Sequence, residues 1–343
     1  MKKNNYFEYL SHPFIVAEIS ANHNGSFEQC IKLINNAKKF GASAVKIQTY
    51  TPDAMTVNSK QKQFIIKKGL WKKYTLWNLF EKAQTPYSWH KRIFEYCKKI
   101  KIQCFSSAFD ETSVRILEEL NCPIYKIASF EMTDYSLLHK IAKTRKPVII
   151  STGMSDIKEI HNSVSFLKKN GTKDLAILYC VSSYPAKDAD FNLNNIKIIK
   201  KNFNCTVGFS DHSNNIEVAK LAYAMGARIF EKHIALKNQK KGFDLKFSLK
   251  GDELKKFRLE LHKVKNLLGK NKFYRNKDEL DNKKFRRSIY AIKDIKKNEI
   301  FTEKNIKSIR PGYGLDPTLF FKILNKKSKK NIKKFSPIKK SFF

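Results

Sequence analysis

The chain has 343 residues, of which 42% are hydrophobic and 13% aromatic, so it can build a sizeable core and is not a disordered protein. No run approaches the roughly 18 consecutive apolar residues of a membrane span, and no apolar segment follows the basic N-terminal residues, so we expect neither a membrane span nor an export signal. The net charge of +37 suggests nucleic acid as a partner, but the lysines are spread along the whole chain, so we favour a positive field that attracts anionic substrates.

The six cysteines lie far apart in the chain, and none forms a Cys-x-x-Cys pair. Several lie inside apolar runs, as buried free thiols do. This usage favours the reducing cytoplasm. The cysteines are Cys30, Cys97, Cys104, Cys122, Cys180 and Cys205.

Eight short apolar runs are typical of strands buried on both faces. They are 14–19, 44–48, 102–106, 124–127, 147–151, 176–180, 205–208 and 228–232. Segments with apolar residues three and four positions apart follow many of them, and we expect helices there. These segments are 28–40, 111–120, 134–143, 157–169, 215–225 and 252–268. Eight βα units predict a (β/α)8 TIM barrel over residues 1–269.

An open doubly wound sheet is the alternative fold. It is less favoured because no Gly-x-Gly-x-x-Gly follows the first strand. Residues 270–284 are polar with little periodicity and are expected to form a linker. Short strand patterns over 288–299 and 306–313 predict a small second domain over 285–343, whose lysine-rich stretch 326–340 we expect to be loosely ordered.

Polar residues of the types that take part in catalysis or ligand binding end or follow each predicted strand. In a parallel barrel the carboxyl ends of the strands share one rim, and active sites lie there. We therefore expect residues that are up to 215 positions apart in the chain to meet at one mouth. The segments are 18–25, 46–48, 106–107, 126–129, 151–153, 182–185, 210–212 and 231–233.

Two histidines, His212 and His233, are 21 residues apart, which is about one strand–helix unit. Neighbouring strands would therefore carry them, and two imidazoles at a rim suit a divalent transition metal with open positions. Two unrelated histidines, one capping a helix and one packed, are the alternative. His23 and His90 are weaker candidates.

Lys46 and Lys126 lie inside apolar strands, where an unpaired ammonium is costly. Together with serine hydroxyls they resemble a cradle for a phosphate-bearing carboxylate. Internal salt bridges to Glu18, Glu131 or Glu231 are the alternative, and the sequence leaves both open. General acid–base candidates are Glu18, Glu231 and Asp244.

Six segments in order closely resemble the sialic acid synthase family. They are Phe14-Ile-Val-Ala-Glu-Ile-Ser-Ala-Asn-His-Asn-Gly-Ser26, Val45-Lys-Ile-Gln-Thr49, Tyr125-Lys-Ile-Ala-Ser-Phe-Glu131, Ser151-Thr-Gly-Met154, Gly208-Phe-Ser-Asp-His212 and Glu231-Lys-His233. The C-terminal segments Arg286-Arg-Ser-Ile-Tyr290 and Ile309-Arg-Pro-Gly312 resemble that family's antifreeze-like (SAF) domain. The resemblance covers nearly the whole chain and implies condensation of phosphoenolpyruvate with an N-acetylated amino sugar.

The resemblance also implies roles for individual residues. It implies that His212 and His233 bind a divalent metal ion, Mn²⁺ first and Mg²⁺ or Co²⁺ as alternatives. The positions that match those holding phosphoenolpyruvate are Lys46, Ser107, Lys126, Ser129, Ser151, Ser182 and Ser210. Gln48, Tyr184 and Asp244 match positions near the sugar and the metal. Arg310 matches an arginine that grips the acetamido group in the neighbouring subunit, which implies a domain-swapped homodimer.

Within the family, three segments resemble the pseudaminic acid synthase branch. They are Gln48-Thr-Tyr-Thr-Pro-Asp53, Gly69-Leu-Trp71 and Thr85-Pro-x-x-Trp-His90. This branch implies 2,4-diacetamido-2,4,6-trideoxy-L-altrose as the sugar, with synthesis of N-acetylneuraminate or legionaminate as alternatives. Three residues depart from the family pattern: Ser182 replaces Asn, Ala108 replaces Pro and Ala128 replaces Gly. The first puts the strength of one phosphoenolpyruvate contact in doubt.

Overall fold

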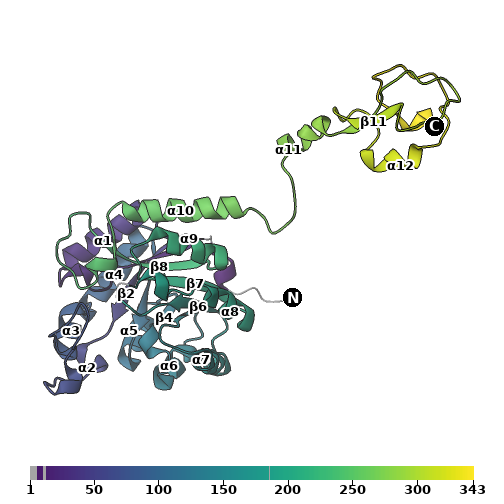
Figure 1. Ribbon diagram of the computed structural model, residues 1–343. Coiled ribbons are helices and arrows are strands. Elements are labelled where there is room, and N and C mark those ends of the chain that lie inside the picture. The colour runs from purple at the N-terminus through teal and green to yellow at the C-terminus, as the bar shows by residue number, and fades with distance from the viewer. Residues whose placement is uncertain (1–5, 11–12, 185) are drawn as a thin grey trace. The chain divides into compact units, whose positions relative to one another are not determined.

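The computed structural model describes residues 6–10, 13–184 and 186–343. The expectation that the N-terminus lacks an export signal concerns residues that lie largely outside the described part of the chain. Pro185 also lies outside it. The chain divides into two compact units, Met1–Gly269 and Lys270–Phe343, and each is treated by itself (Figure 1). None of the helices in the described residues is both long enough and apolar enough for a membrane span.

The first unit is a closed barrel of parallel strands that pair in chain order, with β8 returning to β1 (Figure 1). The strands are β1 Phe14–Glu18, β2 Ala44–Thr49, β3 Gln103–Ala108, β4 Tyr125–Ile127, β5 Val148–Ser151, β6 Leu175–Cys180, β7 Thr206–Asp211 and β8 Ile229–Ala235. The short β9, Leu249–Lys250, extends the sheet beyond β8. All eight predicted strands are confirmed, and the TIM-barrel prediction is correct.

The strands read as continuous apolar runs because both of their faces are covered. Every residue of β1, β6, β7 and β8 is buried, one face toward the barrel interior and the other toward the helices. Side chains alternate between these faces along a strand. A polar residue on the inner face is therefore held inside the barrel.

Helices pack around the barrel (Figure 1). They are α1 Phe27–Lys39, α2 Pro52–Met55, α3 Leu76–Ala83, α4 Tyr87–Lys99, α5 Glu111–Glu119, α6 Tyr135–Lys143, α7 Ile157–Asn170, α8 Asn194–Asn202, α9 Ile216–Met225 and α10 Glu253–Leu268. The six predicted helices are confirmed, whereas the short α2 and helices α3, α4 and α8 were not predicted. The buried face of α4 includes His90, and that of α8 has only Ile196 and Ile199, so neither has a full apolar stripe.

The second unit begins with α11 Lys277–Asp281 and has its own small core. Strands β10 Ser288–Ala291 and β11 Ile306–Ile309 pair antiparallel, and α12 Phe320–Ile323 follows. Helix α11 lies within the predicted linker 270–284. The expectation that 326–340 is loosely ordered was wrong, since Ile332 and Ile338 are buried in the core.

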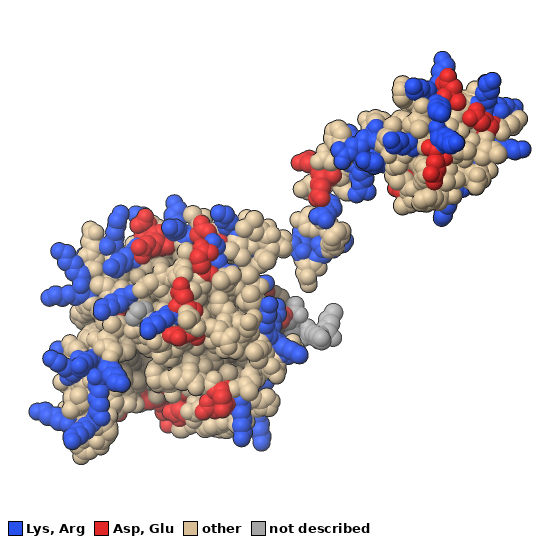
Figure 2. All heavy atoms as spheres, viewed as in Figure 1, with Lys and Arg blue, Asp and Glu red and all other residues tan. Residues whose placement is uncertain are grey.

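Lysine and arginine side chains are dispersed over the visible face of each unit, with acidic side chains among them (Figure 2).

Candidate active site

Inward-facing polar residues from neighbouring strands meet inside the barrel near its carboxyl end. Strand register pairs Glu18 of β1 with Lys46 of β2. It likewise pairs Ser107 with Lys126, and Ser210 with Glu231. All six side chains are buried. The predicted convergence of distant segments is therefore present in the structure.

These side chains form an alternating network of charges. Lys46 Nζ lies 2.5 Å from Glu18 Oε2 and 3.7 Å from Glu231 Oε2, and Lys126 Nζ lies 3.7 Å from Glu231 Oε1. Ser107 Oγ accepts a hydrogen bond from Lys46 at 3.1 Å, and Ser210 Oγ donates one to Glu231 at 3.1 Å. Internal salt bridges thus exist at both lysines.

The two carboxylates of the network differ in proton affinity. Burial raises the pKa of Glu18 above its ordinary value, although Lys46 opposes this effect. Burial acts in the same direction on Glu231, but the Lys126 and Lys46 ammonium groups outweigh it and lower the pKa of Glu231 to about 2. Of the two carboxylates, Glu18 therefore binds a proton more readily than Glu231.

A cradle of hydroxyl groups surrounds Gly153, just beyond β5. Gly153 N–H donates to Ser129 Oγ at 3.0 Å. A Cβ on Gly153 would lie only 2.0 Å from Ser182 Oγ and 2.8 Å from Ser129 Oγ. Ser151 Oγ is buried and has no hydrogen-bond partner among the described residues. The unpartnered Ser151 hydroxyl, with the Ser129 and Ser182 hydroxyls beside Gly153, suits a phosphate or carboxylate oxygen. Gly153 was not predicted as a site residue, although its place just after the strand-end residue Ser151 was a usable signal.

The two candidate metal-binding histidines face each other, with ring centroids 5.5 Å apart. His212 Nδ1 lies 3.1 Å from the Val181 carbonyl oxygen, which orients the ring and leaves Nε2 as the free nitrogen. His233 Nδ1 is buried without a hydrogen-bond partner and lies 3.5 Å from Asp244 Oδ2. Asp244 itself accepts from Ala21 N–H at 3.4 Å.

This donor set fits a divalent transition metal that keeps open positions. Two imidazoles and a nearby carboxylate are ligand types that such ions prefer. Among the described residues, no group of three or more His, Cys, Asp or Glu side chains is arranged to hold an ion unaided. Water or substrate oxygens would therefore complete the coordination.

Aromatic rings cover the histidines on one side. Phe247 lies 5.6 Å from His212 and 4.8 Å from His233, measured between ring centroids. Tyr184 lies 4.5 Å from His212, and burial raises the pKa of its phenol. Phe247 was not predicted as a site residue, because a lone phenylalanine in sequence looks like any core residue.

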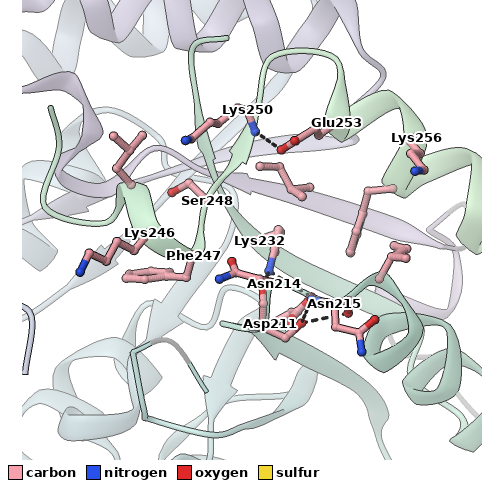
Figure 3. A pocket seen from close by; sticks show the side chains of 15 residues that line it. Asp211, Asn214, Asn215, Lys232, Lys246, Phe247, Ser248, Lys250, Glu253 and Lys256 are labelled. Carbon is pink, nitrogen blue, oxygen red and sulfur yellow. Dashed lines mark hydrogen bonds and ion pairs between the residues drawn. The ribbon is translucent and has the colours of Figure 1, made fainter. Parts of the chain in front are cut away.

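Two polar residues of the same strand ends do not join this site. Asp211 and Lys232 alternate with the histidines and so point to the outer face of the barrel, where they form a 3.3 Å ion pair. Figure 3 shows them facing each other at a separate cavity of about 400 Å³. Lys232 also donates to the carbonyl of Ser213, which follows His212. This pair therefore fixes the chain on either side of His212.

The remaining predicted residues are less tightly placed. Gln48 is half-buried at the end of β2, and Arg310 is exposed on the second unit. His23 and His90 are buried and burial lowers the pKa of each to about 4, so they are neutral. His90 Nε2 lies 2.8 Å from Thr49 Oγ1, within a structural hydrogen-bond network.

Glu131 has a shifted proton affinity that the sequence did not reveal. Burial raises its pKa to about 7, although Lys126 opposes the shift. One of its carboxylate oxygens is buried without a hydrogen-bond partner among the described residues. Glu131 was considered from sequence only as a salt-bridge partner.

The chain is similar to known proteins over nearly its whole length. The chain is 45% identical to the pseudaminic acid synthase of Campylobacter jejuni subsp. jejuni serotype O:23/36 (strain 81-176), over 96% of each chain. It is 39% identical to the pseudaminic acid synthase of Helicobacter pylori (strain ATCC 700392 / 26695), over 96% of this chain and 97% of the relative. A crystal structure of a spore coat polysaccharide biosynthesis protein E from Chromobacterium violaceum ATCC 12472 superposes with a TM-score of 0.81 at 25% identity, covering 96% of this chain and 98% of the other.

Family models account for both units. The NeuB family model matches residues 33–273, and the SAF domain model matches residues 286–343. The resemblance drawn from the motifs is thereby confirmed. The chain belongs to the NeuB family and carries a SAF domain at its C-terminal end.

Proposed function

We propose that this protein is a pseudaminic acid synthase. It condenses phosphoenolpyruvate with 2,4-diacetamido-2,4,6-trideoxy-L-altrose to give pseudaminic acid and inorganic phosphate. The observation that carries the proposal is the convergence in one barrel mouth of two buried lysines, a cradle of serine hydroxyls and a facing pair of histidines. The near full-length similarity to two pseudaminic acid synthases supports the choice of sugar.

A divalent ion, Mn²⁺ in the first instance, is part of the proposal. When bound by His212 and His233, it supplies Lewis-acid polarisation of the sugar aldehyde and a fixed positive charge. The charge balance of the site supports a bound cation. The charges of Lys46 and Lys126 are formally cancelled by the carboxylates of Glu18 and Glu231. Phosphoenolpyruvate brings a further carboxylate and a phosphate, whose negative charge a divalent ion would offset.

The protein's own groups bind the reactants and manage charge. C3 of phosphoenolpyruvate attacks the aldehyde carbon, and the aldehyde oxygen takes up a proton to become a hydroxyl group. Water adds at C2 and loses a proton to leave a hydroxyl group there. The C2–O bond to phosphate then breaks as this hydroxyl gives its proton to the departing phosphate, which leaves the ketone. Lys46 and Lys126 balance the anionic charge, and the serine cradle holds the phosphate oxygens. Glu18, whose pKa burial raises, is the candidate that donates or accepts these protons.

The direct test combines the protein with phosphoenolpyruvate, Mn²⁺ and a panel of acetamido sugars while phosphate release is measured. The altrose should be the preferred sugar. Preference for the N-acetylneuraminate or legionaminate precursor would assign one of those alternatives instead. Product formation from pyruvate without phosphate release would refute the whole reaction class. In ¹⁸O water the label should enter C2 of the product, and label in the phosphate would refute C–O cleavage.

We also propose a domain-swapped homodimer in the cytoplasm, in which Arg310 of one subunit completes the partner's site. Mixing Arg310→Ala protein with His212→Ala protein tests this arrangement. A swapped dimer of the two variants contains one site with an intact histidine pair and an intact arginine, so activity should reappear on mixing. Activity that stays at the level of the separate variants would refute the swap.

A further inference from the structure

Three aromatic side chains from separate loops form a continuous wall beside the histidine pair. The aromatic wall consists of Trp71 from the connection between β2 and α3, Tyr184 after β6 and Phe247 after β8. Ring centroids of Trp71 and Tyr184 lie 5.5 Å apart, and those of Tyr184 and Phe247 lie 5.3 Å apart. Tyr184 in turn lies 4.5 Å from His212.

Trp71 is held in a defined position although it is only half-buried. Its indole Nε1–H donates to the Phe243 carbonyl oxygen at 3.1 Å. Tyr74 of the same connection packs edge-on against the Phe243 ring at 5.8 Å. The connection thus bridges to the segment after β8, and the apolar face of Trp71 is fixed rather than free to collapse.

The distances relate the aromatic wall to the length of the substrate. An open six-carbon chain with bonds of about 1.5 Å is roughly 6 Å long. The ring centroids of His212 and Tyr184 lie 4.5 Å apart and those of Tyr184 and Trp71 lie 5.5 Å apart, so the centroids of His212 and Trp71 are at most about 10 Å apart. A chain of roughly 6 Å that starts beside His212 and runs along the wall therefore ends within van der Waals contact, about 4 Å, of the indole.

We propose that Trp71 is a specificity-determining residue that selects a 6-deoxy sugar, by packing its indole against the C6 methyl group. This inference rests on the proposed function. The only polar atom of the indole is already bonded to Phe243, so a C6 hydroxyl at the same place would be desolvated without a partner there. A methyl group, by contrast, gains from burial against the ring.

The test compares two sugars that differ by one oxygen: 2,4-diacetamido-2,4,6-trideoxy-L-altrose and its 6-hydroxy form. The ratio of their kcat/KM values is measured for the unmodified protein and for Trp71→Ala, Trp71→Phe and Trp77→Ala. Trp71→Ala should lower the preference for the 6-deoxy sugar roughly tenfold. Trp71→Phe keeps an apolar ring but loses the bond to Phe243, and should retain most of the preference.

Trp77 is the matched control, a half-buried tryptophan in α3 with no ring contact to the wall among the described aromatic pairs. Its replacement should leave the ratio and the KM for phosphoenolpyruvate unchanged. Equal loss for both sugars in Trp71→Ala would make the residue a mere loop anchor and overturn the inference. So would equal loss of preference in Trp71→Phe and Trp71→Ala.

Failure of the proposed function has a different signature. In that case the unmodified protein releases no phosphate with the altrose. If it uses N-acetylmannosamine instead, the same ratio is measured with N-acetylmannosamine and its 6-deoxy form. An unchanged ratio in Trp71→Ala then overturns the inference for that sugar too.

Discussion

Replacement of Gly153 by alanine is the sharpest test of the serine cradle. The added Cβ would lie 2.0 Å from Ser182 Oγ and 2.8 Å from Ser129 Oγ, both well inside contact distance. The obstructing atoms are the ends of short side chains that can rotate, and Gly153 is not among the residues with positive φ. We therefore expect a folded protein with a melting temperature within a few degrees of the unmodified one, but with both hydroxyls turned away.

The expected effect is on phosphoenolpyruvate binding. A hydrogen bond to a charged group contributes about 1.5–3 kcal/mol, and each 1.4 kcal/mol is a tenfold change. Loss of one contact should raise the KM for phosphoenolpyruvate by about 10- to 150-fold, and loss of both should raise it further. The assay is phosphate release at saturating sugar, and the KM for the sugar should change much less.

A second substitution separates the clash from other effects. Ser182→Ala removes the nearer oxygen but leaves the clash with Ser129, so the double variant Gly153→Ala, Ser182→Ala should raise the KM by less than the product of the two single effects. Strict additivity of the two changes would show that the methyl group does not act through Ser182. An unchanged KM for phosphoenolpyruvate in Gly153→Ala would refute the cradle itself.

Four further outcomes follow from the described contacts. His212→Ala should abolish metal-dependent turnover while the melting temperature stays near that of the unmodified protein, and full activity after chelation would contradict the metal proposal. Lys46→Met leaves Glu18 buried without its 2.5 Å partner and should cost about 3–5 kcal/mol in urea unfolding, most of which Glu18→Gln should restore in the double variant. Folding raises the pKa of Glu131 from 4.5 to about 7, so the folded state binds the proton more tightly than the unfolded state. Relative to Glu131→Gln, the protein should therefore lose up to about 3 kcal/mol of stability as the pH rises from 4.5 through 7. An equal difference in stability between the two proteins at every pH would exclude this shift. Arg310→Ala should raise the KM for the sugar more than that for phosphoenolpyruvate, and equal increases would show that the second unit does not select the sugar.

Much of the fold was determined by the sequence alone. Strands buried on both faces must be apolar throughout, so β1 to β8 were visible as runs, and their number and alternation with helices predicted the barrel. Helix α4 was missed because a histidine that bonds to Thr49 interrupts its apolar stripe. Burial of that histidine depends on partners from another strand, which local periodicity does not report.

The site was predicted as a set of residues, but its connections were decided by the tertiary structure. Position at strand ends, together with motif resemblance, indicated Lys46, Lys126 and the histidine pair before any coordinates. Which carboxylate pairs with which lysine could not be read from the chain, because that depends on register between strands distant in sequence. The same is true of the pKa difference between Glu18 and Glu231, since burial and the distances to neighbouring charges, not residue type, set proton affinity.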